Sequence, residues 1–109
     1  MALLTPVSLS NLGVAPAAVA AAGGGDEFPN DGRTFVRVIN GGGSSINVTV
    51  VTPATAEGLA ISDAVVAVPN GQSRMIGPFK PSIFNAADGR VDLTYSGVTS
   101  VTVECWRMA

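Results

Sequence analysis

The chain has 109 residues, of which 47% are hydrophobic and 13% are charged, and its formal net charge at pH 7 is -2. This length provides for one domain with one core, and the slightly acidic charge argues against a basic surface that would bind nucleic acid. There is no histidine and only one cysteine, Cys105. We therefore expect no internal disulfide, no Cys/His zinc site and no cofactor.

The first part of the chain, residues 1–32, predicts an extended arm. Several prolines and a run of three glycines interrupt regular structure, and few side chains there exceed alanine in size. The stretch Thr5–Leu9 alternates in the manner of a strand that adds to another sheet. We therefore expect Thr5, Val7 and Leu9 at an interface with a partner.

Two further expectations concern the arm. Residues 15–22 have the composition of a short helix with Pro16 in its first turn. Phe28 follows the glycines and is the expected anchor of the arm, so we also place it at the interface.

The apolar start of the chain predicts neither a signal peptide nor a membrane span. No lysine or arginine precedes Arg33, and prolines and polar side chains interrupt every apolar run. We expect synthesis in the cytoplasm and no membrane partner.

Residues 33–109 predict an all-β domain. Short runs rich in valine and threonine alternate with turn signals, without a convincing amphipathic helix. The predicted strands are Thr34–Asn40, Ile46–Thr52, Val65–Val68, Arg74–Phe79, Arg90–Tyr95 and Ser100–Arg107. The fold class that follows is a single small antiparallel β-sandwich or β-barrel of about six to eight strands, with the extended N-terminal arm.

Turn residues predict how these strands connect. The loop 41–45 is glycine and serine only, which predicts a hairpin between the two strands that flank it. Asn70-Gly71 suits the two positive φ angles of a tight hairpin and predicts a second one. Glu57-Gly58 predicts a turn in the middle of the loop between Thr52 and Asp63.

Trp106 admits two interpretations. Its neighbours on the same strand face, Thr102 and Glu104, are polar, so the alternation places this only tryptophan toward solvent or a partner, where large aromatic side chains often anchor interfaces. The alternative is that a second layer or the arm folds over this face and makes Trp106 an ordinary buried residue.

The chain does not have the residues expected of an enzyme. Its titratable groups are mainly scattered carboxylates, and Cys105 has no histidine to act as its base. We expect Cys105 to be a small buried hydrophobic residue and the chain not to be an enzyme.

A series of strand and turn motifs after Pro29 resembles small head proteins of tailed phages. The motifs occur in the same order in both and lie at residues 30–41, 45–53, 68–71, 76–79, 88–91 and 98–103. The resemblance implies a capsid decoration or cement protein on the outer surface of the virion, with the major capsid protein as partner. It also implies homo-oligomers on the capsid lattice, often trimers, with the arm reaching neighbouring subunits.

Two other functions remain open from the residues. One is a surface-displayed β-sandwich that binds carbohydrate or a host, for which Tyr95 and Trp106 are the candidates for stacking on a sugar. The other is a head-completion or tail structural protein present in few copies.

Overall fold

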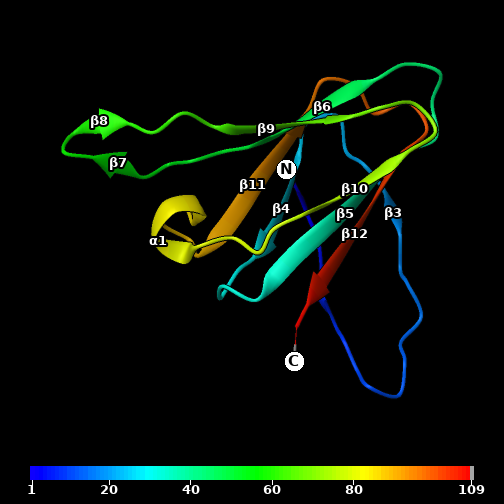
Figure 1. Cartoon of the computed structure of the whole chain (residues 1–109). Helices are drawn as coiled ribbons and strands as arrows, with labels where there is room; N and C mark the ends of the chain where they lie inside the picture. Colours follow the sequence, from blue (N-terminus) through cyan, green and yellow to red (C-terminus); the bar gives the residue numbers. More distant parts are fainter. Residues whose placement is uncertain (109) are drawn as a thin grey trace.

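A computed structural model describes residues 1–108. Two sheets pack face to face, and neither closes into a barrel within this part of the chain (Figure 1). The predicted β-sandwich is therefore confirmed, and the barrel alternative is wrong. Seven of the described strands have four or more residues, in the predicted range of six to eight, and five more have two residues each.

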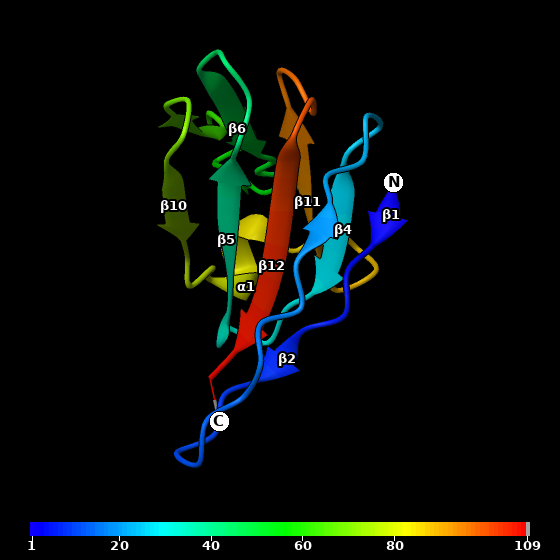
Figure 2. The same ribbon diagram turned by 90° about the vertical axis from the view of Figure 1, so that its right-hand side faces the viewer.

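The first sheet, sheet A, has five strands. In spatial order they are β1 (Ala2–Leu3), β4 (Asp26–Pro29), β11 (Arg90–Tyr95), β6 (Ile46–Val50) and β9 (Ala64–Val68). Sheet B, in front in Figure 2, contains β10 (Ser73–Ile76), β5 (Thr34–Asn40), β12 (Val101–Arg107) and β2 (Val7–Ser8), and β3 (Val19–Ala20) also pairs with β12. Outside the two sheets lie β7 (Thr55–Ala56), β8 (Leu59–Ala60) and the short helix α1 (Pro81–Phe84).

Both sheets are mixed rather than purely antiparallel. The arm strand β1 runs parallel to β4, and β2 runs parallel to β12, while the pairs between the longer strands are antiparallel. The expectation of an antiparallel sandwich thus holds for the longer strands and fails where the N-terminal segment joins the sheets.

The core forms because alternate residues of each long strand point between the sheets. Along β5 the buried and half-buried positions alternate without a break. The fully buried side chains of the core are mostly valines: Val36, Val38, Val48, Val50, Val68, Val91 and Val103, together with Phe28 and Leu93. Cys105 is buried among them, as predicted, and carries a free thiol.

The first predicted hairpin is wrong. Strand β5 lies in sheet B and β6 lies in sheet A, so the loop 41–45 crosses from one sheet to the other. The Asn40 side chain holds this crossing, because its amide nitrogen donates to the carbonyl oxygens of Ser44 at 2.8 Å and Val68 at 3.0 Å. Strand β5 pairs instead with β12 over seven residues.

The second predicted hairpin, at Asn70-Gly71, is also wrong. Strand β9 pairs with β6 in sheet A, whereas β10 pairs with β5 in sheet B. Of the two turn residues only Gly71 has a positive φ angle, 73°. The tight hairpin turn needs positive angles at both positions, so this turn redirects the chain between the sheets.

A hairpin is formed instead by β6 and β9. Between them the chain runs out through β7, reverses at Glu57-Gly58 and returns through β8, so the predicted turn at these residues is confirmed. Both turn residues have positive φ angles, 53° and 80°. The distal part of this hairpin projects from the sandwich, on the left in Figure 1.

The N-terminal segment lies along the edges of the sandwich. Residues 15–22 do not form the predicted helix: Val19 and Ala20 form β3, and the Ala21 amide donates to the Val101 carbonyl at 3.0 Å. Alanine favours helix, but a stretch of eight residues is too short for a stable helix by itself, so the hydrogen bonds at the edge of β12 prevail. Leu4 and Ala21 contribute to the core.

Part of the predicted arm belongs to the sandwich. Strand β4, within residues 1–32, pairs with β11 over four residues, and Phe28 on it is fully buried. The composition change near residue 33 therefore does not mark the start of the packed structure.

Candidate functional site

Trp106 is buried, with 8% of its surface exposed. It lies on the outer face of sheet B, between Val7 of β2 on one side and Phe35 of β5 on the other. Its indole nitrogen donates to Oε1 of Glu104 at 3.3 Å, and the same oxygen accepts from Arg37 Nη1 at 3.3 Å. Of the two interpretations of Trp106, the structure supports the second one: the side chain is buried and lies beside the arm.

The predicted interface residues of the first strand lie beside Trp106 on the chain itself. Val7 is half-buried opposite Trp106, Thr5 is exposed, and the Leu9 amide donates to the Arg107 carbonyl at 2.9 Å. Strand addition by residues 5–9 thus takes place on β12 of the same chain. A contact of these residues with a partner stays a prediction.

Phe28 lies in the core and not at the surface. Its ring centroid is 5.6 Å from that of Phe79, and Phe79 in turn lies 5.4 Å from Phe84 on α1. Phe28 therefore anchors the chain, as expected, but it offers no surface to a partner in this conformation.

A segment between β2 and β3, which we call the arm loop (residues 9–18), is exposed at every position. It projects beyond the sandwich, at the bottom of Figure 2. Its apolar side chains include Leu9 at 37%, Leu12 at 93% and Val14 at 39% exposure, and the chain has no charged side chain before Asp26. The sequence pattern did not single out Leu12 or Val14, because exposure is fixed by the path of the loop.

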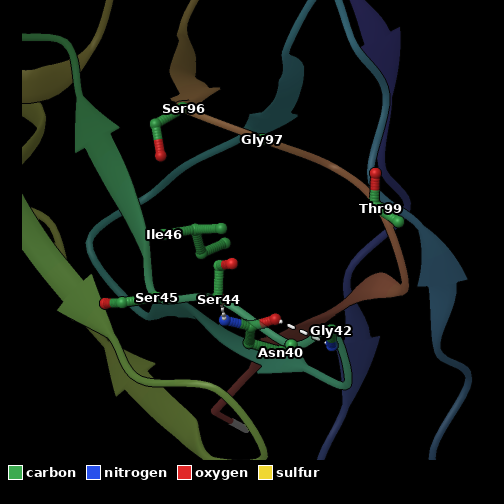
Figure 3. A pocket seen from close by; sticks show the side chains of 9 residues that line it. Asn40, Gly42, Ser44, Ser45, Ile46, Ser96, Gly97 and Thr99 are labelled. Atoms are coloured by element: carbon green, nitrogen blue, oxygen red, sulfur yellow. Dashed lines mark hydrogen bonds between the residues drawn. The ribbon is translucent and has the colours of Figure 1, made fainter.

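A polar cavity of about 410 Å³ lies at one end of the sandwich, where loops 41–45 and 96–99 face each other (Figure 3). Serine, glycine and threonine residues line it together with Asn40 and Ile46, and the lining contains no ionisable side chain. The Asn40 oxygen accepts from the Gly42 amide at 3.0 Å, and its nitrogen has two partners. Asn40 therefore acts as a structural support of the loop.

Ionisable groups gather loosely around β4 and β11. The Tyr95 hydroxyl donates to Oδ2 of Asp26 at 2.7 Å, while Oδ1 of Asp26 is buried without a hydrogen-bond partner. Burial, followed by the hydrogen bond to Asp26, raises the pKa of Tyr95 well above its ordinary value. Tyr95 is thus held by its hydroxyl and only half-exposed, in a poor position to stack on a sugar.

A pair of carboxylates lies on the outer face of sheet A. Asp92 is opposite Glu27, and Arg90 Nη1 donates to Glu27 Oε1 at 3.0 Å. Burial raises the pKa of Asp92, and the negative charges of Glu27 and Asp88 raise it further. Among residues 1–108 no three His, Cys, Asp or Glu side chains come together as a metal-binding group would require.

Comparison with protein-family models, with curated proteins and with solved structures finds no match to this chain. Within residues 1–108, no helix has the length and apolar character needed to cross a membrane.

Proposed function

We propose that this chain is a structural virion protein that decorates and stabilises a bacteriophage capsid by binding the lattice of the major capsid protein on the outside of the head. The observation that carries the proposal is the arm loop, an exposed, uncharged segment that projects from the sandwich and has Leu12 at its surface. The motifs after Pro29 resemble those of small head proteins of tailed phages, and this resemblance suggests a phage head as the particle. The proposal assigns no catalytic activity and no cofactor to the chain.

The arm loop has the properties of a segment that fastens onto a neighbouring protein. Both ends are fixed to β12, by the Leu9 amide on one side and by β3 on the other. Fixed ends lower the entropy that the loop loses when it docks. Burying one exposed leucine contributes about 2 kcal/mol, and many copies on one shell make such contacts collectively strong.

The two alternatives have less support. A carbohydrate-binding module needs exposed aromatic rings, and Trp106 is buried while Tyr95 is held through its hydroxyl. A head-completion or tail protein shares the compact fold but is present in few copies, so the number of copies per particle separates it from a decoration protein.

The test is a binding titration on purified heads that lack the chain. We expect the recombinant chain to saturate the heads in many copies, counted by quantitative mass spectrometry of washed particles. Leu12→Asp places a charge on the docking surface and lowers the occupancy at least about tenfold at a subsaturating concentration.

Leu59→Asp is the matched control. Leu59 is 73% exposed on β8, at the tip of the projecting hairpin and far from the arm loop (Figure 1). The Leu59→Asp variant should occupy the heads as fully as the unmodified chain does. Equal occupancy of Leu12→Asp would remove the arm loop from the mechanism, a few copies per particle would favour the low-copy role, and no binding would overturn the proposal.

A further inference from the structure

The two edge strands of sheet A differ in length. At one edge lies β1, which pairs with β4, where the Ala2 amide donates to the Gly25 carbonyl at 3.1 Å; with two residues it is too short to pair with much of a partner strand. At the other edge β9 has β6 on one side and no strand of the described chain on the other. Strand β9 therefore presents an open row of backbone groups over five residues.

The open groups can be assigned to particular residues. Both the amide and the carbonyl of Asn47 point toward the end of β11. The amide donates to the Ser96 hydroxyl at 2.8 Å, and the carbonyl accepts from the Ser96 amide at 3.0 Å. Backbone groups alternate in direction along a strand, so those of Val48 point toward β9 and bond Val66 opposite it. The amides and carbonyls of Val65 and Ala67 consequently point to the open edge.

Strand β9 does not have the features with which proteins protect an exposed edge. Such edges usually carry a lysine, an inward-pointing charge, a bulge or a proline within the strand. Strand β9 is Ala-Val-Val-Ala-Val, and Val65 is 59% exposed. By contrast, β10, the edge strand of sheet B, carries the charged residue Arg74 on the same face as the buried Ile76.

We propose that β9 pairs antiparallel with β9 of a second copy of this chain, which joins two A sheets into one. A two-fold axis at Val66 places Val65 of each copy opposite Ala67 of the other, so both residues with open backbone groups are satisfied.

A second copy fits this edge because the strand is uncharged. In a two-fold pair, identical residues lie near one another, so a charged strand would repel itself, whereas β9 would not. Between Val50 and Arg74 only Glu57 and Asp63 are charged. Asp63 accepts hydrogen bonds from the amide and the hydroxyl of Thr52 at 2.9 and 3.0 Å, and Glu57 lies at the hairpin turn.

The inference is independent of the proposed function. Two-fold pairing gives dimers or assemblies built from dimers, so it competes with the trimer that the resemblance implies. It also makes no use of the arm loop, which lies at the lower right in Figure 1, away from β9.

The first measurement is the mass of the purified full-length chain by sedimentation velocity from about 1 to about 500 μM, the range in which small interfaces dimerise. We expect the mass to rise with concentration from 10.9 kDa to twice that value. In hydrogen exchange followed by NMR, the Val65 and Ala67 amides should become protected over the same range, while the Val66 amide is protected throughout.

Two substitutions test the edge itself. Ala67→Pro removes an amide that has no partner in the single chain, so the monomer should stay folded while the dimer dissociation constant rises at least about tenfold. Val65→Lys places an edge charge at a surface position and should have the same effect. Leu3→Lys is the matched control, because Leu3 is 55% exposed on β1, the short strand at the opposite edge of sheet A, and it should dimerise like the unmodified chain.

A mass of one chain at every concentration would overturn the inference, as would a dimer that forms equally well with Ala67→Pro and Val65→Lys. A trimer with the Val65 and Ala67 amides unprotected would also overturn it. None of these results bears on head binding by the arm loop, and loss of head binding by Leu12→Asp would leave the dimer unaffected.

Discussion

At the scale of single residues, Asp92 is the carboxylate whose ionisation opposes folding. Its Oδ1 atom is buried without a hydrogen-bond partner, and Glu27 lies opposite it on β4. Burial and the neighbouring negative charges raise its pKa above the ordinary 3.8. The folded chain therefore holds this proton more tightly than the unfolded chain does.

Asp92→Asn is expected to stabilise the chain at pH 7. As the pH rises through 3.8, the unfolded chain releases the proton first, and stability falls until the folded pKa is passed. Asparagine does not titrate, so the variant does not lose this free energy of unfolding. Its advantage over the unmodified chain appears at a pH above the folded pKa of Asp92, and it should stay below about 1 kcal/mol because solvent screens a partly exposed group. Urea unfolding of both proteins at pH 3 and pH 7 measures this difference in the free energy of unfolding. If the free energy of unfolding changed equally with pH in both proteins, the prediction would be wrong.

The burial of Trp106 shows what a residue pattern can and cannot predict. Alternation on β12 correctly placed Trp106 on the face opposite Val103 and Cys105. It could not show that Trp106 is flanked by Val7 of β2 as well as by β5, because β2 lies almost a hundred residues earlier in the chain. Similarly, nothing local indicated that the arm loop would leave Leu12 exposed.

At the scale of elements, the turn between β3 and β4 determines how the N-terminal segment is attached. The Gly25 amide donates to the Ala22 carbonyl at 3.0 Å, and Gly25 has a φ angle of 94°. A Cβ atom at Gly25 would lie 2.5 Å from the Leu93 carbonyl oxygen, whereas one at Gly24 would meet nothing within 4 Å.

Gly25→Ala should therefore lower the free energy of unfolding by at least about 2 kcal/mol, through the strained φ angle and the clash with β11. Gly24→Ala at the neighbouring position should change it by less than about 0.5 kcal/mol. Chemical denaturation of the two variants compares these values directly. Equal stabilities would contradict the close approach of Gly25 to the Leu93 carbonyl.

The strands themselves were largely predictable, and their partners were not. The predicted bounds of β5 and β11 agree with the structure, and those of β12 differ by one residue. Period-two alternation reports one buried face, but it does not report which of two sheets a strand joins. A short loop such as 41–45 serves a hairpin and a crossing between sheets equally well, so Asn40, which holds the crossing, carried no recognisable signal.

At the scale of the whole molecule, the N-terminal segment seals one side of the sandwich. Leu4 and Ala21 add to the core there, and Cys105 lies beneath the segment next to a cavity of about 270 Å³ lined also by Leu4, Val7 and Val103. Burial raises the pKa of the Cys105 thiol to about 12. The thiol of the intact chain is thus neutral and covered.

Deletion of residues 1–22 should open this side. We expect Cys105 of the shortened chain to react with a disulfide reagent at pH 8 at least about tenfold faster than in the intact chain, because exposure restores an ordinary thiol pKa. The shortened chain should also unfold at lower temperature. Circular dichroism serves as the control that it retains β structure, and an unchanged rate in a folded truncation would contradict the covering role.

The position of β12 has a consequence for how the protein is made. This last strand pairs with β5 over its whole length, and β2 and β3 also lie against it. Sheet B therefore cannot assemble until β12 has been synthesised, and until then β2 and β3 have no edge to pair with. Because most partners are distant in sequence, folding should be slow, and sheet B should form late.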